Sequence, residues 1–176
     1  MSKDKMKYIW HDYDPNTMQY VESWLDENAI QFTGLEEGFR PFYEYWVNED
    51  GFVLGQNIWC KVVFEHEEPF AVTAFCLYEN TIKIMEVVVQ PEKRGQNKGS
   101  NLLKELINCK EIIGFQIHKS EAVIYPNNPA SQKAFEKAGF KHHYSHKDAD
   151  GDSMIYVYNH NEVQYEASRE SDSAYR

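Results

Sequence analysis

The chain has 176 residues, of which 42% are hydrophobic, so it is long and apolar enough to form one folded domain with a sizeable core. Its 28 acidic and 18 basic residues leave a net charge of −10, which argues against a nucleic-acid partner because nucleic acids bind basic surfaces. No apolar run approaches the roughly 20 residues of a transmembrane helix, so we expect no membrane partner either.

The cysteines and the N-terminal residues favour a cytoplasmic protein. Cys60, Cys76 and Cys109 are odd in number and form no C-x-x-C pair, which is typical of free, mostly buried thiols in a reducing compartment. The first residues lack the apolar segment of a secretory signal peptide. The negative net charge would suit a polycationic small substrate, although an acidic composition also serves solubility alone.

The N-terminal part of the chain predicts one strand and two helices. Tyr8-Ile9-Trp10 is expected to form the strand. Asp14 and Pro15 would be the N-cap and the first residue of a helix. After a loop at Thr33-Gly34, residues 39–46 predict a second, short helix. The apolar face of the first helix would consist of Met18, Val21, Trp24 and Leu25.

The middle of the chain predicts three antiparallel strands in succession. The runs 58–65, 70–78 and 81–89 have the β-branched and aromatic character of strands. Tight turns near Glu67-Glu68-Pro69 and at Glu79-Asn80 would join them. The three strands would form a meander that leads directly into the next loop.

The loop at residues 94–100, Arg-Gly-Gln-Asn-Lys-Gly-Ser, is predicted to bind an anion. It lies between the strand at 81–89 and an amphipathic helix predicted at 97–109. A strand that turns through such residues into a helix directs several backbone N–H groups at one spot, where the helix dipole adds positive potential. Arg94 and Lys98 add formal charge there, so we expect the loop to hold phosphate.

A second well-bounded helix follows a buried strand predicted at residues 122–125. Asn128 would be its N-cap, Pro129 its first residue and Gly139 its C-terminal stop. These three residue types in this order predict both ends of the helix.

The C-terminal part predicts a hairpin and a tail. The strand-like runs 141–146 and 154–158 flank Asp150-Gly151, a strong hairpin signal. Residues 164–176 offer no aliphatic core residue and are expected to form a flexible tail, which leaves residues 1–163 as a single domain.

Known phosphate-binding motifs can be compared with the loop at 94–100. A P-loop requires a lysine directly after its last glycine, but Lys98 precedes Gly99. A dinucleotide-binding motif requires three spaced glycines, and only Gly95 and Gly99 are present. The loop instead resembles the Arg-x-x-Gly-x-Gly/Ala motif of the GNAT superfamily of N-acetyltransferases, as Arg94-x-x-Asn97-x-Gly99. Asn97 replaces the first glycine, and asparagine tolerates positive φ better than other side chains do.

The helix at residues 128–140 is similar to a second motif of that superfamily, Asn-x-x-Ala-x-x-x-Tyr-x-x-x-Gly-Phe. The two motifs occur in the same order as in the family. Together they extend the resemblance over residues 58–159. It implies an α+β (mixed α/β) GNAT fold: one domain with a mixed, mostly antiparallel sheet of six or seven strands and about four helices. The end of the chain, from Gly139-Phe140 through the hairpin, is also similar to the aminoglycoside 6′-N-acetyltransferase branch.

The resemblance implies that the chain binds acetyl-CoA and moves its acetyl group directly to a small-molecule amine in a ternary complex. The loop would wrap the diphosphate, and two strands that part beside it would hold the pantetheine arm and the acetyl group. The implied cofactor-binding residues are Val87, Val88, Val89, Arg94, Gly95, Gln96, Asn97, Lys98, Gly99, Ser100, Asn128, Ser131 and Phe135.

Glu86 is the candidate general base, because it is the carboxylate inside an apolar strand and burial would raise its pKa. The alternatives are a solvated position or a salt bridge with Lys83 or Lys61.

The family's usual acid is a tyrosine that would protonate the departing thiolate, and its position is occupied by Phe135. Tyr125 or Tyr144 would then replace it, water would serve, or catalysis would be impaired. A CoA thiolate is a tolerable leaving group without an acid, since a free thiol has a pKa of about 8.5.

The N-terminal half mixes carboxylates with aromatic residues, which suits a cationic acceptor. The candidate substrate-binding residues are Trp24, Glu27, Tyr43 and Trp46, with the alternative that the aromatic ones belong to the core. An aminoglycoside-like or polyamine-like amine is the preferred acceptor. N-terminal acetylation of proteins or peptides and a non-catalytic acyl-CoA sensor remain alternatives, and so does assembly into a homodimer.

His142, His143 and His146 do not predict a metal site. Neighbouring residues on a strand face opposite ways, and no cysteine or carboxylate completes a ligand set. We expect no metal.

Overall fold

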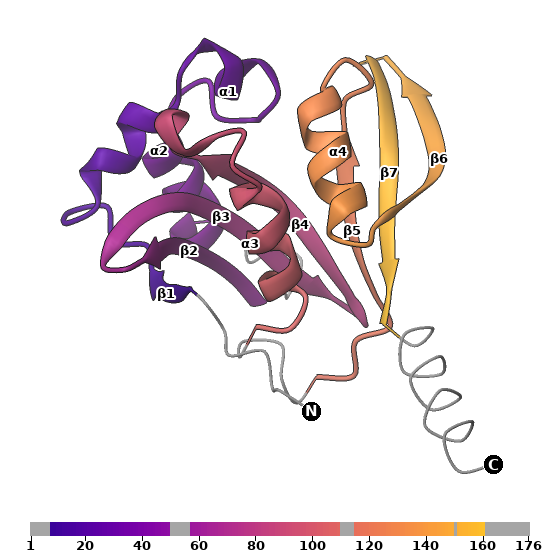
Figure 1. The fold of residues 1–176 in the computed structure, drawn as a ribbon, viewed down its shortest axis with the longest axis horizontal. Helices are drawn as coiled ribbons and strands as arrows, with labels where there is room; N and C mark the ends of the chain where they lie inside the picture. The colour runs from indigo at the N-terminus through magenta and orange to yellow at the C-terminus, as the bar shows by residue number, and fades with distance from the viewer. Residues whose placement is uncertain (1–7, 50–56, 110–114, 150, 161–176) are drawn as a thin grey trace.

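The computed structural model describes residues 8–49, 57–109, 115–149 and 151–160, which form a single mixed sheet with helices on both faces (Figure 1). The sheet order is β1-β2-β3-β4-β5-β7-β6, and the pairing of β4 with β5 is parallel whereas the others are antiparallel. The strands are β1 (Ile9–Asp12), β2 (Asn57–Glu65), β3 (Glu68–Tyr78), β4 (Thr81–Val89), β5 (Lys119–Ile124), β6 (Lys141–Asp148) and β7 (Gly151–Asn159).

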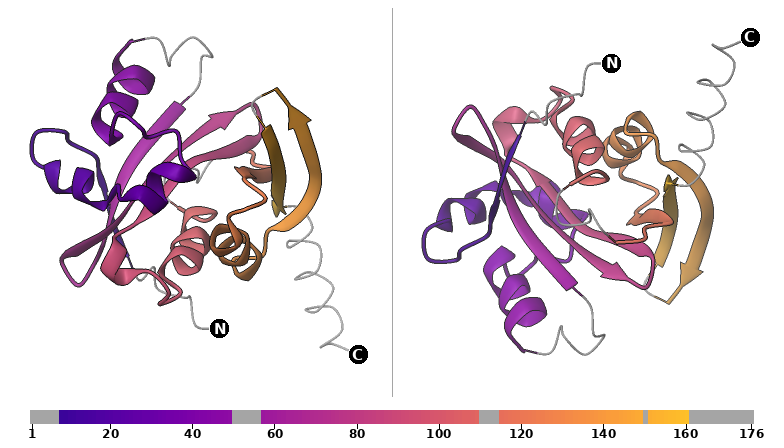
Figure 2. Two further views of the ribbon diagram at one scale, coloured as in Figure 1. Left: turned by 90° about the horizontal axis from the view of Figure 1, so that it is seen from above. Right: turned by 90° about the horizontal axis from the view of Figure 1, so that it is seen from below.

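The helices lie in two groups, with α1 and α2 on one face of the sheet and α3 and α4 on the other (Figure 2). Their bounds are 3₁₀ helix η1 (Gln19–Trp24), α1 (Glu27–Gln31), α2 (Phe39–Tyr43), π-helix η2 (Glu44–Glu49), 3₁₀ helix η4 (Pro91–Lys93), α3 (Lys98–Leu106) and α4 (Pro129–Lys137). Among the described residues, no helix has the length and apolar character needed to cross a membrane. The predicted α+β class with a mixed, mostly antiparallel sheet is confirmed.

Each face of the sheet has its own hydrophobic core, because side chains of a strand point alternately to the two faces. On β3, Phe75 packs with the cluster under α3 and α4, whereas Val72 and Ala74 pack with the cluster under η1 and α2. Cys60, Cys76 and Cys109 are buried and form no disulfide in the part of the chain that the structure describes, as predicted.

The meander follows the predicted strands, with one turn displaced. The residues between β2 and β3 are His66 and Glu67, with φ of 50° and 68°, so the turn lies slightly before the predicted Glu67-Glu68-Pro69. Two successive positive φ values give the two-residue turn whose twist matches the flanking strands. The turn at Glu79-Asn80 is confirmed.

The predicted first helix is wrong in its start and its type. Asp14 accepts hydrogen bonds from Asn16 N at 2.9 Å and Thr17 Oγ1 at 3.0 Å, so it closes a turn instead of capping a helix. The segment that follows is the 3₁₀ helix η1, in which Val21 and Trp24 are buried on one side because a 3₁₀ helix repeats every three residues.

A separate helix, α1, then begins at Glu27, and the sequence analysis did not predict it. The Asp26 side chain accepts a hydrogen bond from Ala29 N at 2.9 Å, which caps its N-terminus. The second predicted helix, at 39–46, is confirmed as α2 and the start of η2.

The C-terminal elements agree closely with the prediction. Asn128 caps α4 by accepting a hydrogen bond from Ser131 N at 3.1 Å, and Gly139 ends the helix with φ of 98°. The hairpin of β6 and β7 is paired up to Asp148 and Gly151. The predicted tail, residues 164–176, lies outside the described residues.

The parallel pair β4 and β5 is the feature that makes room for a site. The two strands are paired from Thr81 opposite Lys119 to Ile84 opposite Ala122, and no further. At that point β4 contains a bulge at Met85, because consecutive residues of β3 pair with the residues before and after it. A bulge bends its strand, so the rest of β4 parts from β5.

Candidate active site

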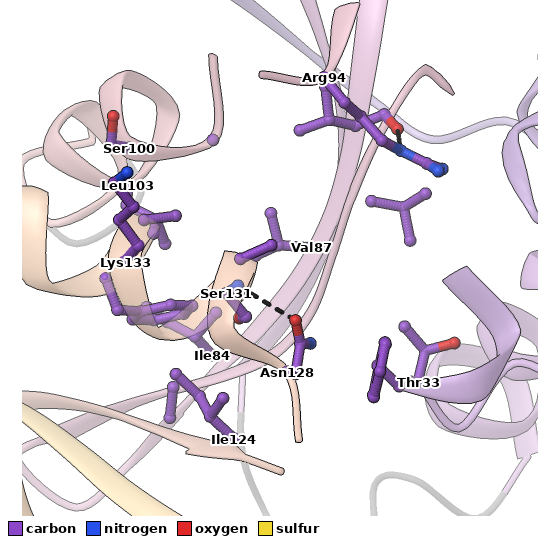
Figure 3. A pocket seen from close by; sticks show the side chains of 18 of the residues that line it. Thr33, Ile84, Val87, Arg94, Ser100, Leu103, Ile124, Asn128, Ser131 and Lys133 are labelled. Carbon is purple, nitrogen blue, oxygen red and sulfur yellow. Dashed lines mark hydrogen bonds between the residues drawn. The ribbon is translucent and has the colours of Figure 1, made fainter. Parts of the chain in front are cut away.

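A cavity of about 550 Å³ occupies the opening between β4 and β5 (Figure 3). Its walls are α1, the second half of β4, the loop and first turns of α3, the end of β5, and α4. The volume is in the range of sites for cofactors and small molecules, about 300–1,000 Å³. Of the thirteen residues predicted to bind the cofactor, all line this cavity except Gln96, whose amide donates to Glu92 O at 3.0 Å.

The first turn of α3 presents to the cavity backbone N–H groups that have no backbone acceptor among the described residues. Asn97 is the N-cap residue and adopts the left-handed conformation, with φ of 58°. Asparagine therefore makes a turn at the position where the resemblance has glycine. Its side chain does not cap the helix, and the N–H groups of Lys98, Gly99 and Ser100 donate to no backbone acceptor among the described residues. All three residues line the cavity, so their N–H groups form a cradle for an anion.

Arg94 is not free to add its charge to this cradle. Its guanidinium lies 2.7 Å from Asp26 Oδ2, and it also donates to Trp24 O at 3.1 Å and to Val89 O at 2.9 Å. The hydrogen bond from Arg94 also holds the pKa of the Asp26 carboxyl below its usual value. Arg94 therefore joins the end of β4 to the N-terminus of α1, a role that sequence patterns did not indicate.

Lys98 is likewise paired. Its Nζ binds the Glu65 carboxylate at the end of β2, and the ammonium lies over the Phe70 ring, 5.7 Å from its centroid. The anion cradle therefore consists of backbone groups more than of the two predicted side-chain charges.

The α4 wall of the cavity holds the second predicted group. Asn128 and Ser131 lie side by side in Figure 3, joined by the hydrogen bond that caps the helix. Phe135 lines the cavity but is 95% buried, with its ring centroid 5.0 Å from that of Phe140 and 6.5 Å from that of Tyr156. At this position the cavity wall therefore has a phenyl ring and no hydroxyl group.

Glu86 lies on the β4 wall and is the acidic residue among those that line the cavity. Burial raises the pKa of its carboxyl to about 7, against the opposing effect of a hydrogen bond that Oε1 accepts from Gly34 N at 3.1 Å. Neither alternative salt bridge is formed, because Lys83 pairs with Glu121 and Lys61 pairs with Asp12. A carboxyl group half-ionised near neutral pH suits proton transfer.

The two tyrosines predicted to replace the missing acid are not among the residues that line the cavity. Tyr125, just beyond β5, is 45% exposed, and Tyr144, on β6, is 52% exposed. The structure does not bring either hydroxyl together with Glu86.

The four predicted substrate residues are also outside the cavity lining. Trp24 is buried in the core under η1, Tyr43 packs its ring 5.1 Å from Tyr13, and Trp46 lies 5.3 Å from the Tyr45 ring. Glu27 is exposed at the start of α1.

The residues on this side that do line the cavity come from α1 and the two residues after it, and the sequence analysis did not identify them. Asp26 followed by the acidic Glu27 is a helix-start signal that would have found that helix. The lining residues are Asn28 and Ala29 of α1, and Phe32 and Thr33 directly after it.

In the ranges that the structure describes, no group of three histidine, cysteine, aspartate or glutamate residues is arranged to hold a metal ion.

The chain was compared with known proteins. The family model described as the Acetyltransferase (GNAT) family matches residues 8–140. No curated protein matches the chain in sequence.

Solved structures are similar at low identity. The aminoglycoside acetyltransferase AAC(6′)-Ib, in complex with paromomycin and acetyl-CoA, is 13% identical, with a TM-score of 0.71 over 90% of this chain and 96% of that one. Spermidine N-acetyltransferase from Vibrio cholerae, in complex with CoA and spermine, is 9% identical, with a TM-score of 0.67 over 89% and 98%. At these identities the likeness shows the fold alone, which is the fold predicted from the two motifs.

Proposed function

Because this chain belongs to the Acetyltransferase (GNAT) family, we propose that it moves the acetyl group of acetyl-CoA to a primary amine of a cationic small molecule. The observation that carries the proposal is the cavity where β4 and β5 part. It combines a cradle of unpaired N–H groups at one end with a carboxyl group of pKa about 7 on its wall.

Acetyl-CoA, the acetyl donor, fits the residues that line the cavity. The N–H groups of Lys98, Gly99 and Ser100 would bind the diphosphate of CoA, with the dipole of α3 adding to the attraction. The edge of β4 from Val87 to Val89 has no partner strand on this side, so its backbone would bind the pantetheine arm. Asn128, at the mouth of α4, would contact the amide linkages of that arm.

The reaction needs one proton acceptor, and Glu86 would supply it. Its carboxylate would take the proton from the ammonium or amine, directly or through one water, and the amine nitrogen would then attack the thioester carbonyl carbon. The C–S bond breaks as the new C–N bond becomes an amide, the second N–H proton passes through water to the departing thiolate, and the first proton returns from Glu86 to solvent. Phe135 has no proton to give, and a thiol pKa of about 8.5 makes the unassisted departure feasible.

A cationic acceptor is supported by a second carboxylate, Glu36, whose charge acts on Glu86. The Glu36 carboxylate is close enough to raise the pKa of Glu86, so the two carboxylates would attract an ammonium group between them. Asn28 of α1 and Thr33, just after that helix, offer polar groups for hydroxyls or further amines. Structural neighbours bind paromomycin and spermine, so aminoglycosides and polyamines are the acceptors to test first.

A second candidate function is a non-catalytic sensor of acyl-CoA, which Phe135 at the usual tyrosine position favours. The experiment that separates the two is thiol release from acetyl-CoA over a panel of kanamycin, ribostamycin, spermidine, spermine and peptides with free N-termini. We expect release with at least one small cationic amine and none with the Glu86→Gln variant. Tight acetyl-CoA binding with no release for any amine would favour the sensor, and release with peptides alone would favour N-terminal acetylation.

We further propose that the protein acts in the cytoplasm. Three buried thiols without a disulfide, Cys60, Cys76 and Cys109, support a reducing compartment.

A further inference from the structure

The cavity carries a positive charge that the chain as a whole lacks. Four basic residues and one acidic residue, Glu86, line it, whereas the full sequence has 18 basic and 28 acidic residues. The basic ones are Arg94, Lys98, Lys133 and Lys137. Such a local inversion of charge marks a binding site for an anion of high charge.

Two of the four cations are already neutralised by carboxylates. Arg94 pairs with Asp26 at 2.7 Å, and Lys98 pairs with Glu65 while both side chains are largely buried. Because each of these charges has its own counter-charge, the surplus must come from α4.

Lys133 and Lys137 are the two cations without an acidic partner. Lys137 Nζ donates to the neutral Asn97 Oδ1 at 2.7 Å, and Lys133 forms no hydrogen bond or ion pair with any residue the structure describes. In Figure 3 the Lys133 side chain extends toward Ser100 and Leu103 on α3. The two lysines are four residues apart on one face of a helix, where like charges repel each other. An anion bound between them would remove that repulsion.

The two helices bring these lysines to the anion cradle. The first turn of α3 packs directly on α4, since a Cβ built at Gly99 would lie 3.7 Å from Ala134 Cβ. Lys137, one turn after Lys133, reaches Asn97, the N-cap of α3. Both lysines therefore lie beside the N–H groups that would bind the diphosphate.

We propose that Lys133 and Lys137 bind the 3′-phosphate of coenzyme A, an inference that rests on the proposed function. Coenzyme A carries two strongly charged groups, the diphosphate and the phosphate monoester on the ribose. The backbone N–H groups at the start of α3 suit the diphosphate, so the phosphate monoester is the group that remains for the lysines. A phosphate monoester carries about −1.5 to −2 charges at pH 7, and lysine binds phosphate as a compact point charge. On binding, Lys137 exchanges the neutral Asn97 oxygen for an anionic one. The lysine pair thereby selects CoA over nucleotides and thioesters that lack this phosphate.

The test compares CoA with dephospho-CoA, which differs only by the 3′-phosphate. Calorimetric titration in phosphate-free buffer would measure both affinities for the wild type, Lys133→Gln, Lys137→Gln and the double variant. Lys104→Gln is the matched control, because Lys104 is an exposed lysine of α3 that does not line the cavity. We expect the wild type to prefer CoA by about tenfold or more, as two charge-assisted contacts to one phosphate imply. The preference should fall close to one in the double variant and stay unchanged in Lys104→Gln.

Three outcomes would overturn the inference while leaving the proposed function intact. They are a wild type that binds both ligands equally, a double variant that binds both ligands as the wild type does, and a double variant that loses affinity for both ligands to the same extent. The last of these would assign the lysines to the diphosphate instead. Failure of the folded wild type to bind either ligand would overturn the proposed function, and this inference with it. Thermal unfolding of each variant would confirm that it is folded.

Discussion

Nη1 of Arg94 lies 2.7 Å from Oδ2 of Asp26, which joins the loop that would bind the donor to the helix that would contact the acceptor. The same Asp26 carboxylate caps α1 through Ala29 N, so one side chain sets both the position and the start of that helix. Arg94 also donates to Val89 O at the end of β4. Arg94 is therefore a positioning residue for α1, and its charge is already paired with Asp26 before any cofactor binds.

The first prediction concerns Arg94→Gln. Without the guanidinium, α1 loses its attachment to β4, and the KM for the amine should rise by about tenfold, equivalent to 1.4 kcal/mol. The dissociation constant for CoA should change little, because the backbone cradle remains. Initial-rate kinetics with varied amine, together with CoA titration, would measure the two effects separately.

Asp26→Asn is the matched variant, because asparagine keeps the helix cap and removes only the charge that pairs with Arg94. It should raise the amine KM as Arg94→Gln does, and the double variant should be no worse than either single one. A loss of CoA affinity with an unchanged amine KM would instead assign Arg94 to the phosphates.

Whether the sequence predicts a feature of this site depends on how far apart along the chain the interacting residues lie. The caps of α4 at Asn128 and Gly139 are local, so residue types within one helix were enough to predict them. The partner of Arg94 is 68 residues away in the chain, and no local pattern contains that information. An aromatic side chain such as Trp24 can bind a ligand or pack in the core, and its sequence context does not distinguish the two. The structure places Trp24 in the core.

Glu86→Gln should lower kcat by about 10²–10⁴-fold, the usual contribution of a general base, with little change in CoA affinity. The wild-type kcat should rise with pH through about 7, because the carboxylate is the active form and its pKa is raised to about 7 by burial. The pH dependence of kcat over pH 5.5 to 9 would test this. A profile that is flat below pH 8, or a Gln variant with full activity, would remove Glu86 from the mechanism.

Glu86 should also make the stability depend on pH. Its pKa is higher in the folded state, about 7 against an ordinary value of 4.5, so the folded protein binds more protons than the unfolded chain between these values. Stability is therefore highest at low pH within this window and is lost as the pH rises toward 7. Glu86→Gln removes the cost of a buried charge and keeps the acceptor for Gly34 N.

The melting temperature of Glu86→Gln should accordingly exceed that of the wild type at pH 8, and the difference should shrink at pH 5. Thermal unfolding followed by circular dichroism at both pH values would measure it. Equal differences at the two pH values would mean that Glu86 is not desolvated in the folded protein.

Phe135→Tyr tests whether the missing acid matters. A hydroxyl added at this position would enter the cavity wall beside the departing thiolate, whereas Phe140→Tyr, also buried but not in the cavity lining, controls for the effect of a buried hydroxyl on stability. Because a thiolate of pKa about 8.5 leaves without help, we expect kcat of Phe135→Tyr to stay within about tenfold of the wild type. Activity present only in the tyrosine variant would show that the natural chain is the non-catalytic sensor.

Asn97→Gly distinguishes the role of the backbone turn at Asn97 from that of the hydrogen bond that its side chain accepts from Lys137. Asn97 has φ of 58°, a conformation that glycine adopts without strain, so the loop should keep its shape. The change removes the Oδ1 that accepts the hydrogen bond from Lys137, which frees that ammonium for a ligand. CoA affinity should therefore be equal to or higher than that of the wild type, whereas Asn97→Val, which disfavours positive φ, should weaken it. Titration of both variants with CoA would decide, and a Gly variant that binds CoA more weakly than the wild type would show that the Asn97 side chain itself contacts the ligand.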